Sequence, residues 1–361
     1  MVLDFTAALY LGLRHPSSSL VSWASLTTGV PAALAVPLDA VRVAAAAGSL
    51  LGCARAALAP STLHLFWDLF AVLAGEDSSV HIDAGAYPIG RWGAERLRGR
   101  GIPTQTFHHH DPEALRLQLR ECARRRRRPL VLSDGYCPGC GAAPISAYSG
   151  LARRFGGRLV VDDTQAVGVL GADPTPDAPF GRGGGGSLRW HGVDGAHVVV
   201  CASLAKGLGV PLAVLGGSAD VIERFETCAE TRVHCSPPSA AVLRAAERAL
   251  ALNRTVGDAL RARLADLVDR LRTRSGLAGL PLCGGAFPVQ SLDPGPAAAE
   301  VHRRLLALGV RGVLHRPAHG GGPVISFVLT ARHRERDIDA AVAALVRATR
   351  AHVATPAALR A

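Results

Sequence analysis

Short apolar runs alternate with helix-like stretches through the middle of the chain. The predicted strands are the runs at 80–83, 130–135 and 158–163 and the more polar segment 104–107, and segments with helical patterning separate them. Strands that are joined through helices at this spacing predict a parallel sheet with helices on its faces. The sequence therefore predicts an α/β fold class.

Three aspartates stand at the ends of predicted strands: Asp83, Asp134 and Asp162. The carboxyl ends of parallel strands lie at one edge of the sheet, and ligands of α/β proteins collect there. We therefore expect a ligand site at this edge.

Lys206 is the only lysine in the chain, and it follows the apolar run 198–202 on a loop of small residues. Apolar surroundings remove hydration from an ammonium group, which lowers its pKa and makes the amine a usable nucleophile. A Schiff-base lysine needs this property, although a surface lysine in a turn would give the same local pattern. With Asp162, Lys206 predicts a site for pyridoxal 5'-phosphate (PLP), in which the lysine bonds the cofactor and the carboxylate keeps the pyridine nitrogen protonated. An ordinary salt bridge between the two residues is the alternative.

The length of 361 residues is sufficient for two lobes. We predict an N-terminal segment at 1–45, a large domain at 46–253 and a small α+β domain at 254–361. Amphipathic helices are expected at 239–252 and 256–271. The further elements expected in the small domain are strands at 287–291, 310–314 and 324–329 and helices at 297–308 and 335–350.

The net charge of +11 raises the question of nucleic-acid binding. The densest basic patch, 124–128, has no interleaved aromatic residues, so a solvated helix end explains it better. The apolar region 30–58 is interrupted by charged residues, which argues against a membrane span. No signal peptide is recognised, and the eight scattered cysteines indicate no disulfide framework. These features predict a cytoplasmic protein.

Cys137 and Cys140 form one C-x-x-C motif in the loop after Asp134. A single motif without a second pair or a ligating histidine does not make a zinc site. A redox role would need a helix that begins directly behind the motif. The expectation is therefore a structural loop and no metal.

Several motifs, in order along nearly the whole chain, resemble those of the α-oxoamine synthases, the family of 8-amino-7-oxononanoate synthase. The motifs are F-T-A-A-L-Y-L-G-L at 5–13, V-V-D-D-T-Q-A-V-G-V-L-G at 160–171, S-L-A-K-G-L-G at 203–209 and L-T-A-R-H at 329–333. The resemblance implies fold type I of the PLP-dependent transferases, with a mostly parallel seven-stranded sheet in the large domain. It also implies decarboxylative condensation of an amino acid with an acyl thioester (acyl-CoA or carrier-bound) and a homodimer.

The resemblance assigns roles to individual residues of this chain. Lys206 would be the Schiff-base lysine and would move the Cα proton, while Asp162 would pair with the pyridine nitrogen. Tyr87 would stack on the cofactor ring in place of a histidine, and Gln165 would lie beside the phenolic oxygen. The residues expected at the phosphate are Ser203, Thr62 and Leu63, with Ser236 reaching the phosphate in a second subunit.

The chain departs from the family pattern mainly on the substrate side. Gln165 replaces a histidine and cannot titrate, and Phe66 replaces an asparagine on the phosphate helix. Ser326 stands where an arginine is expected to hold the substrate carboxylate, a bidentate contact that one serine cannot replace. Arg316 and His319 are nearby candidates for that contact.

Two alternatives to condensation therefore stay open. One is a PLP-dependent aminotransferase, or other Cα chemistry on an amine substrate. The other is a catalytically altered PLP-binding scaffold in a biosynthetic pathway.

Overall fold

The structure, a computed structural model, describes residues 2–317 and 320–353. It divides into two compact units. The large unit contains Leu13–Cys137 and Ala142–Asp258, and the small unit contains Met1–Gly12, Pro138–Gly141 and Ala259–Ala361. The division predicted from the sequence, 1–45, 46–253 and 254–361, stays a proposal.

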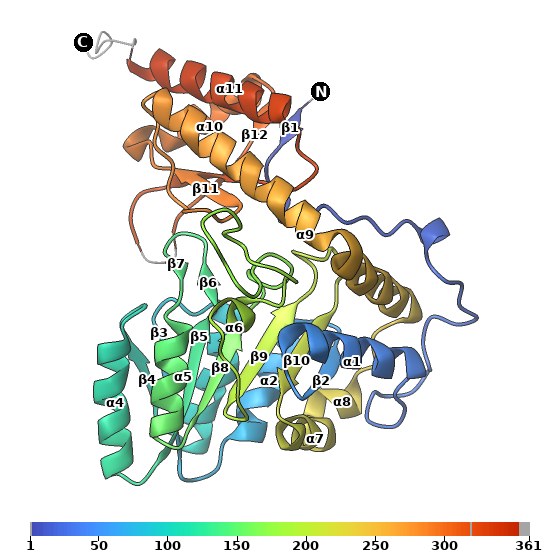
Figure 1. The fold of residues 1–361 in the computed structure, drawn as a ribbon. Coiled ribbons are helices and arrows are strands. Elements are labelled where there is room, and N and C mark those ends of the chain that lie inside the picture. Colours follow the sequence, from blue (N-terminus) through green and yellow to red (C-terminus); the bar gives the residue numbers. More distant parts are fainter. Residues whose placement is uncertain (1, 318–319, 354–361) are drawn as a thin grey trace. The chain divides into compact units, whose positions relative to one another are not determined.

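A seven-stranded sheet forms the centre of the large unit, in the order β2-β10-β9-β8-β5-β3-β4 (Figure 1). Only β10 runs antiparallel to its neighbours within this sheet. The predicted α/β fold with a mostly parallel seven-stranded sheet is therefore confirmed. The strands are β2 (Arg55–Ala59), β3 (Ser78–Asp83), β4 (Thr104–Phe107), β5 (Arg128–Asp134), β8 (Arg158–Asp162), β9 (Val198–Ser203) and β10 (Ala213–Gly217).

Helices cover both faces of this sheet. On one face, Phe66 and Leu69 of α2 pack in a buried cluster with Ile82, Leu132 and Val160 from the strands. Side chains alternate along a strand, so Ser79 and His81 of β3 point to the other face, where both bond residues of α4. The helices of the large unit are α1 (Leu38–Leu51), α2 (Thr62–Leu73), α3 (Pro88–Glu95), α4 (Pro112–Arg124), α5 (Ile145–Arg154), α6 (Ser187–Trp190), α7 (Ala219–Cys228) and α8 (Glu230–His234).

One long helix, α9 (Ala240–Leu277), replaces the two helices predicted at 239–252 and 256–271. The prediction of a break was wrong because no proline or glycine lies between the two segments. Asn253, which occupies the expected break, instead donates its side-chain amide to the carbonyl oxygen of Gly183 at 2.8 Å.

The small unit contains an antiparallel sheet in the order β11-β14-β13. The other strand pair joins β1 to β12 in parallel. These elements match the predicted α+β character of the C-terminal part. They are β1 (Leu3–Asp4), β11 (Val289–Leu292), β12 (Val310–Arg311), β13 (Val313–His315), β14 (Val324–Val328), α10 (Ala298–Ala307) and α11 (Glu335–Val353).

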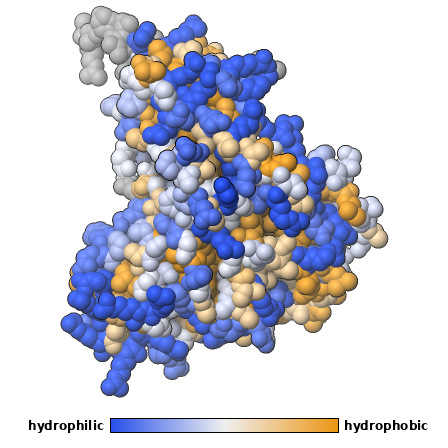
Figure 2. Space-filling model, viewed as in Figure 1, coloured by the Kyte–Doolittle hydropathy of each residue, from blue (hydrophilic) through white to orange (hydrophobic). Residues whose placement is uncertain are grey.

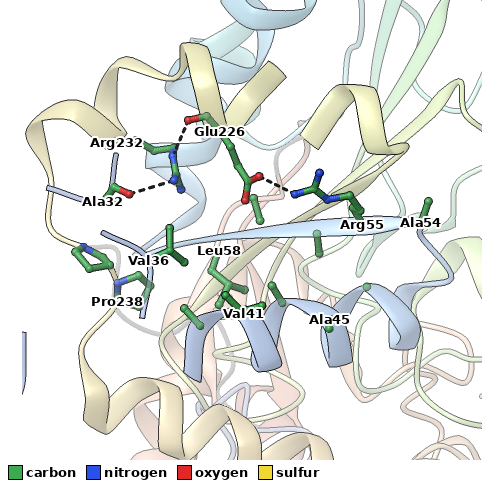
Figure 3. Close-up of a pocket in the computed structure, with 16 residues that line it drawn as sticks. Ala32, Val36, Val41, Ala45, Ala54, Arg55, Leu58, Glu226, Arg232 and Pro238 are labelled. Carbon is green, nitrogen blue, oxygen red and sulfur yellow. Dashed lines mark hydrogen bonds and ion pairs between the residues drawn. The ribbon is translucent and has the colours of Figure 1, made fainter. Parts of the chain in front are cut away.

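The surface around α1 is apolar (Figure 2). Leu34, Leu38 and Val41 are 77%, 79% and 53% exposed. A crevice of about 260 Å³ lies between α1 and β2, lined largely by alanines. Figure 3 shows an ion pair of 2.9 Å between Arg55 and Glu226 at this crevice.

None of the helices in the described part of the chain is both long and apolar enough to cross a membrane.

The contact between α2 and α3 gives a test of the packing. A Cβ atom at Gly93 of α3 would lie 2.0 Å from the backbone oxygen of Phe66, whereas one at Gly150 of α5 would meet no atom within 4 Å. We expect Gly93→Ala to lower the free energy of unfolding by about 1–3 kcal/mol. Gly150→Ala, the matched control, should be neutral or raise it by up to about 1 kcal/mol. Urea unfolding measures both, and equal effects would contradict this packing.

Candidate active site

Three adjacent strands bring the predicted acid and base residues together. Asp134 and Asp162 are the last residues of β5 and β8, and their Cα atoms are paired in the parallel register. Lys206 follows β9, the other neighbour of β8. The ammonium group is close enough to influence the pKa of both carboxyl groups. The carboxyl edge of the sheet therefore holds two carboxylates and one amine.

Burial dominates the electrostatics of this group. It raises the pKa of Asp162, which hydrogen bonds from Thr164 and the charge of Lys206 oppose. It raises the pKa of Asp134 well above the usual range, as does the neighbouring charge of Asp162. Burial also lowers the pKa of Lys206, against the attraction of both carboxylates. A lysine with a lowered pKa has more of its amine in the nucleophilic form.

Glycines allow the lysine loop to pack directly on the loop that follows Asp162. A Cβ atom at Gly207 would lie 2.2 Å from the carbonyl oxygen of Val167. Gly168 has a φ of +88°, and a Cβ atom there would lie 2.9 Å from the Cα of Gly207. The two loops meet backbone to backbone, which only glycine permits at these positions.

Thr164 ties the ends of β8 and β9 together. Its backbone N–H donates to Asp162 Oδ1 at 3.1 Å, and its Oγ1 accepts from the N–H of Ser203 at 3.1 Å. Ser203 Oγ accepts from the N–H of Ala205 at 3.3 Å, so its own proton is available for an anion. Gln165 follows Thr164 and is half-buried in the same turn.

Tyr87 lies at the same edge of the sheet. Its backbone N–H donates to Asp134 Oδ1 at 3.0 Å, and Pro88 then begins α3. The Tyr87 side chain is 56% exposed. An exposed aromatic ring is able to stack on a planar ligand.

The start of α2 provides backbone donors for an anion. Ala59 at the end of β2 is in register with Ala213 of β10, which is in register with Ser203 of β9, so Thr62 and Leu63 lie near the level of Ser203. The side chain of the N-cap residue Ser61 makes no cap hydrogen bond. The first N–H groups of a helix attract phosphate.

Two other residues considered in the sequence analysis lie near this helix. Phe66 is fully buried in the core. Ser236 lines a small crevice together with Pro60 and His64. Its expected role at the phosphate of a second subunit stays a proposal.

In the small unit, Ser326 belongs to a chain of hydrogen bonds. Its Oγ lies 2.7 Å from Ser291 Oγ and 2.8 Å from His315 Nε2. Ser326 is buried and His315 is exposed. Of the two substitutes considered from the sequence, Arg316 lies next to His315, while His319 falls outside the described residues.

Sequence reasoning did not assign site roles to three of these residues: Asp134, Thr164 and His315. Asp134 stands at a strand end like Asp162, a signal that was visible. The contacts of Thr164 and His315 depend on strand pairing, which the sequence does not reveal.

Comparison with known proteins identifies the family. The model of the class I and II aminotransferases matches residues 70–322. The chain belongs to this family.

Sequence relatives and a solved structure are similar to this chain. The chain is 31% identical over 252 residues to 8-amino-7-oxononanoate synthase of Nitrosococcus oceani, covering 68% of this chain and 63% of that one. The same enzyme of Halorhodospira halophila is 32% identical over 270 residues, covering 71% and 62%. The matches therefore span less than two thirds of these relatives. Serine palmitoyltransferase of Sphingomonas wittichii has a TM-score of 0.84 at 18% identity, covering 98% of this chain and 89% of that one.

The predicted relation to PLP-dependent transferases of fold type I is confirmed by family and fold. The residues of the large unit also fit the cofactor. Asp162 and Lys206 lie at one edge of the sheet, and the start of α2 and the Ser203 hydroxyl offer donors for a phosphate.

Asp163, which follows Asp162 in the sequence, is a buried carboxyl group that predicts how the stability of the protein depends on pH. It accepts from the backbone N–H and the hydroxyl of Ser187 at 2.8 and 2.5 Å, and burial raises its pKa from 3.8 to about 7. The folded state therefore binds more protons than the unfolded state between these values, so the free energy of unfolding falls as pH rises through this window.

Asp163→Asn removes this titration. Between pH 5 and 7, we expect the variant to lose about 2 kcal/mol less stability than the wild type. Urea unfolding at a series of pH values measures the slopes. Parallel slopes for the two proteins would show that Asp163 does not titrate in this range.

Proposed function

We propose that the chain is a PLP-dependent acyltransferase of the α-oxoamine synthase type, which condenses an amino acid with an acyl thioester and releases carbon dioxide. The arrangement of Asp162 and Lys206 on adjacent strands β8 and β9 carries this proposal. Support for the reaction comes from the relatives named 8-amino-7-oxononanoate synthase.

Different residues of the large unit would hold different parts of the cofactor. Bound PLP withdraws electrons from the α-carbon of an amine substrate. Asp162 would accept the hydrogen bond of the pyridine N–H, and Lys206 would hold the cofactor covalently. The Ser203 hydroxyl and the N–H groups of Thr62 and Leu63 would bind the phosphate.

Other residues act on the substrate side of the ring. Lys206 would take the proton from the α-carbon of the substrate and return it, and its lowered pKa suits that exchange. Tyr87 would cover one face of the ring, while Gln165 would donate a hydrogen bond near the phenolic oxygen without titrating.

The two candidate functions differ in whether the substrate has a carboxylate that the protein must bind. Ser326 stands where the family pattern has an arginine, and its hydroxyl is hydrogen-bonded to His315. A substrate amine without a carboxylate, used in transamination, is the alternative that the serine at 326 favours.

A homodimer is the proposed assembly. The exposed aliphatic side chains Leu34, Leu38 and Val41 support it, because monomers rarely expose contiguous apolar surface. The cytoplasmic location stays a prediction.

Because Lys206 is the only lysine, covalent trapping tests the cofactor assignment sharply. Borohydride reduction of the protein with PLP should fix one pyridoxyl phosphate group per chain on the peptide that contains Lys206. The only other primary amine is the N-terminal one, so Lys206→Ala should leave background labelling there. Peptide mass spectrometry locates the label. Equal labelling of both proteins would refute the assignment and favour neither reaction.

A substrate panel separates condensation from transamination. With amino acids and acyl-CoA thioesters, the proposal predicts that carbon dioxide and free CoA thiol are released together in equal amounts. Asp162→Ala should reduce the rate at least a hundredfold, because the electron-withdrawing ring loses its pairing partner. Amine transfer to a keto acid without thiol release would establish the aminotransferase alternative instead. Cofactor binding with neither activity would favour the scaffold.

A further inference from the structure

We propose that His109, Cys137 and Cys140 bind a zinc ion. A histidine nitrogen and the Cys137 sulfur lie within 4.8 Å of one another. Cys140 follows Cys137 with the C-x-x-C spacing of zinc-binding motifs. The sequence interpretation set zinc aside because no ligating histidine was visible near the motif. The fold supplies that histidine from a residue 28 positions upstream.

Strand order explains why these residues meet. His109 follows β4 and Cys137 follows β5, and these strands pair in parallel with the two sides of β3. Their loops therefore leave the sheet at the same edge, on either side of Asp83, the last residue of β3. The juxtaposition is a product of topology, which explains why spacing alone did not predict it.

A buried carboxylate orients the histidine. His109 Nδ1 donates to Asp83 Oδ1 at 2.5 Å, and Asp83 is only 1% exposed. The Asp83 carboxylate is itself held by the N–H of Gly85 at 2.7 Å and the hydroxyl of Tyr148 at 3.1 Å. With the proton on Nδ1, the lone pair of the imidazole is on Nε2. Ligating histidines of zinc sites typically have such a carboxylate partner, which fixes the tautomer.

The turn between the cysteines suits a metal-binding knuckle. Pro138 and Gly139 separate the two cysteines, and Gly141, directly after them, has a φ of +94°. The short strands β6 (Tyr136–Cys137) and β7 (Gly141–Ala142) flank the turn. Two thiolates and one neutral imidazole balance the charge of Zn²⁺ and leave one tetrahedral position for solvent or another donor.

The ion would brace the edge of the sheet that carries the cofactor residues. Asp83 begins the loop that leads to Tyr87, so a metal on His109 fixes this loop through one hydrogen bond. The ion takes no part in the proposed condensation. The site therefore stands or falls independently of the proposed function.

Metal analysis of the full chain tests the site. The protein is purified under reducing conditions from zinc-supplemented cells, and any histidine tag is removed. Elemental mass spectrometry should find close to one zinc per chain. His109→Ala, Cys137→Ser and Cys140→Ser should each reduce it at least tenfold. His108→Ala and Cys228→Ser are matched controls at exposed positions and should retain the metal.

Two further measurements keep the proposal falsifiable if a ligand variant folds poorly. Cobalt exchanged into the wild-type protein should show thiolate-to-cobalt charge-transfer bands and the visible bands of a tetrahedral site. Asp83→Asn should weaken zinc affinity about tenfold or more in a chelator competition.

Three results would overturn the proposal. They are wild-type protein that takes up no zinc with its thiols reduced, zinc retained when both cysteines are replaced, and a Cys137–Cys140 disulfide that persists under reducing conditions.

Discussion

The parallel pairing of β5, β8 and β9 is the constraint on which the candidate active site depends. It aligns the last residues of β5 and β8, so that Asp134 and Asp162 stand side by side. It also brings the charge of Lys206 close enough to act on both carboxyl groups. Two carboxylates buried at such a point repel each other and lose hydration. The ammonium group of Lys206 offsets part of that cost, and a protonated pyridine nitrogen would offset more. A cationic ring beside Asp162 would therefore be favoured at this edge of the sheet.

Much of the fold was predictable because its signals are local. The strands at 80–83, 130–135 and 158–163 are short apolar runs, and helical segments separate them. In the structure, all three are strands of the seven-stranded sheet. The strand β2 was missed because Arg55–Ala59 is mostly alanine and lacks the β-branched residues that mark strands. The break predicted between 252 and 256 was wrong, because no proline or glycine at 253–255 interrupts α9.

In the candidate site, too, local features were predictable and long-range contacts were not. Lys206 and Asp162 were predictable because each lies within a motif that its sequence neighbours form. Contacts such as Thr164 with Ser203 or His315 with Ser326 depend on which strands pair and in which register. The approach of His109 to Cys137 has the same origin, since β3 lies between the strands that precede them. Long-range partners of this kind leave no periodic pattern in a single sequence.

A crystal structure of the wild-type protein with PLP tests the central claim most directly. The account predicts continuous electron density from Lys206 Nζ to the cofactor, the Asp162 carboxylate within hydrogen-bonding distance of the pyridine nitrogen, and the phosphate at the start of α2. A cofactor bound elsewhere, or bound here with Asp162 turned away from the ring nitrogen, would contradict it.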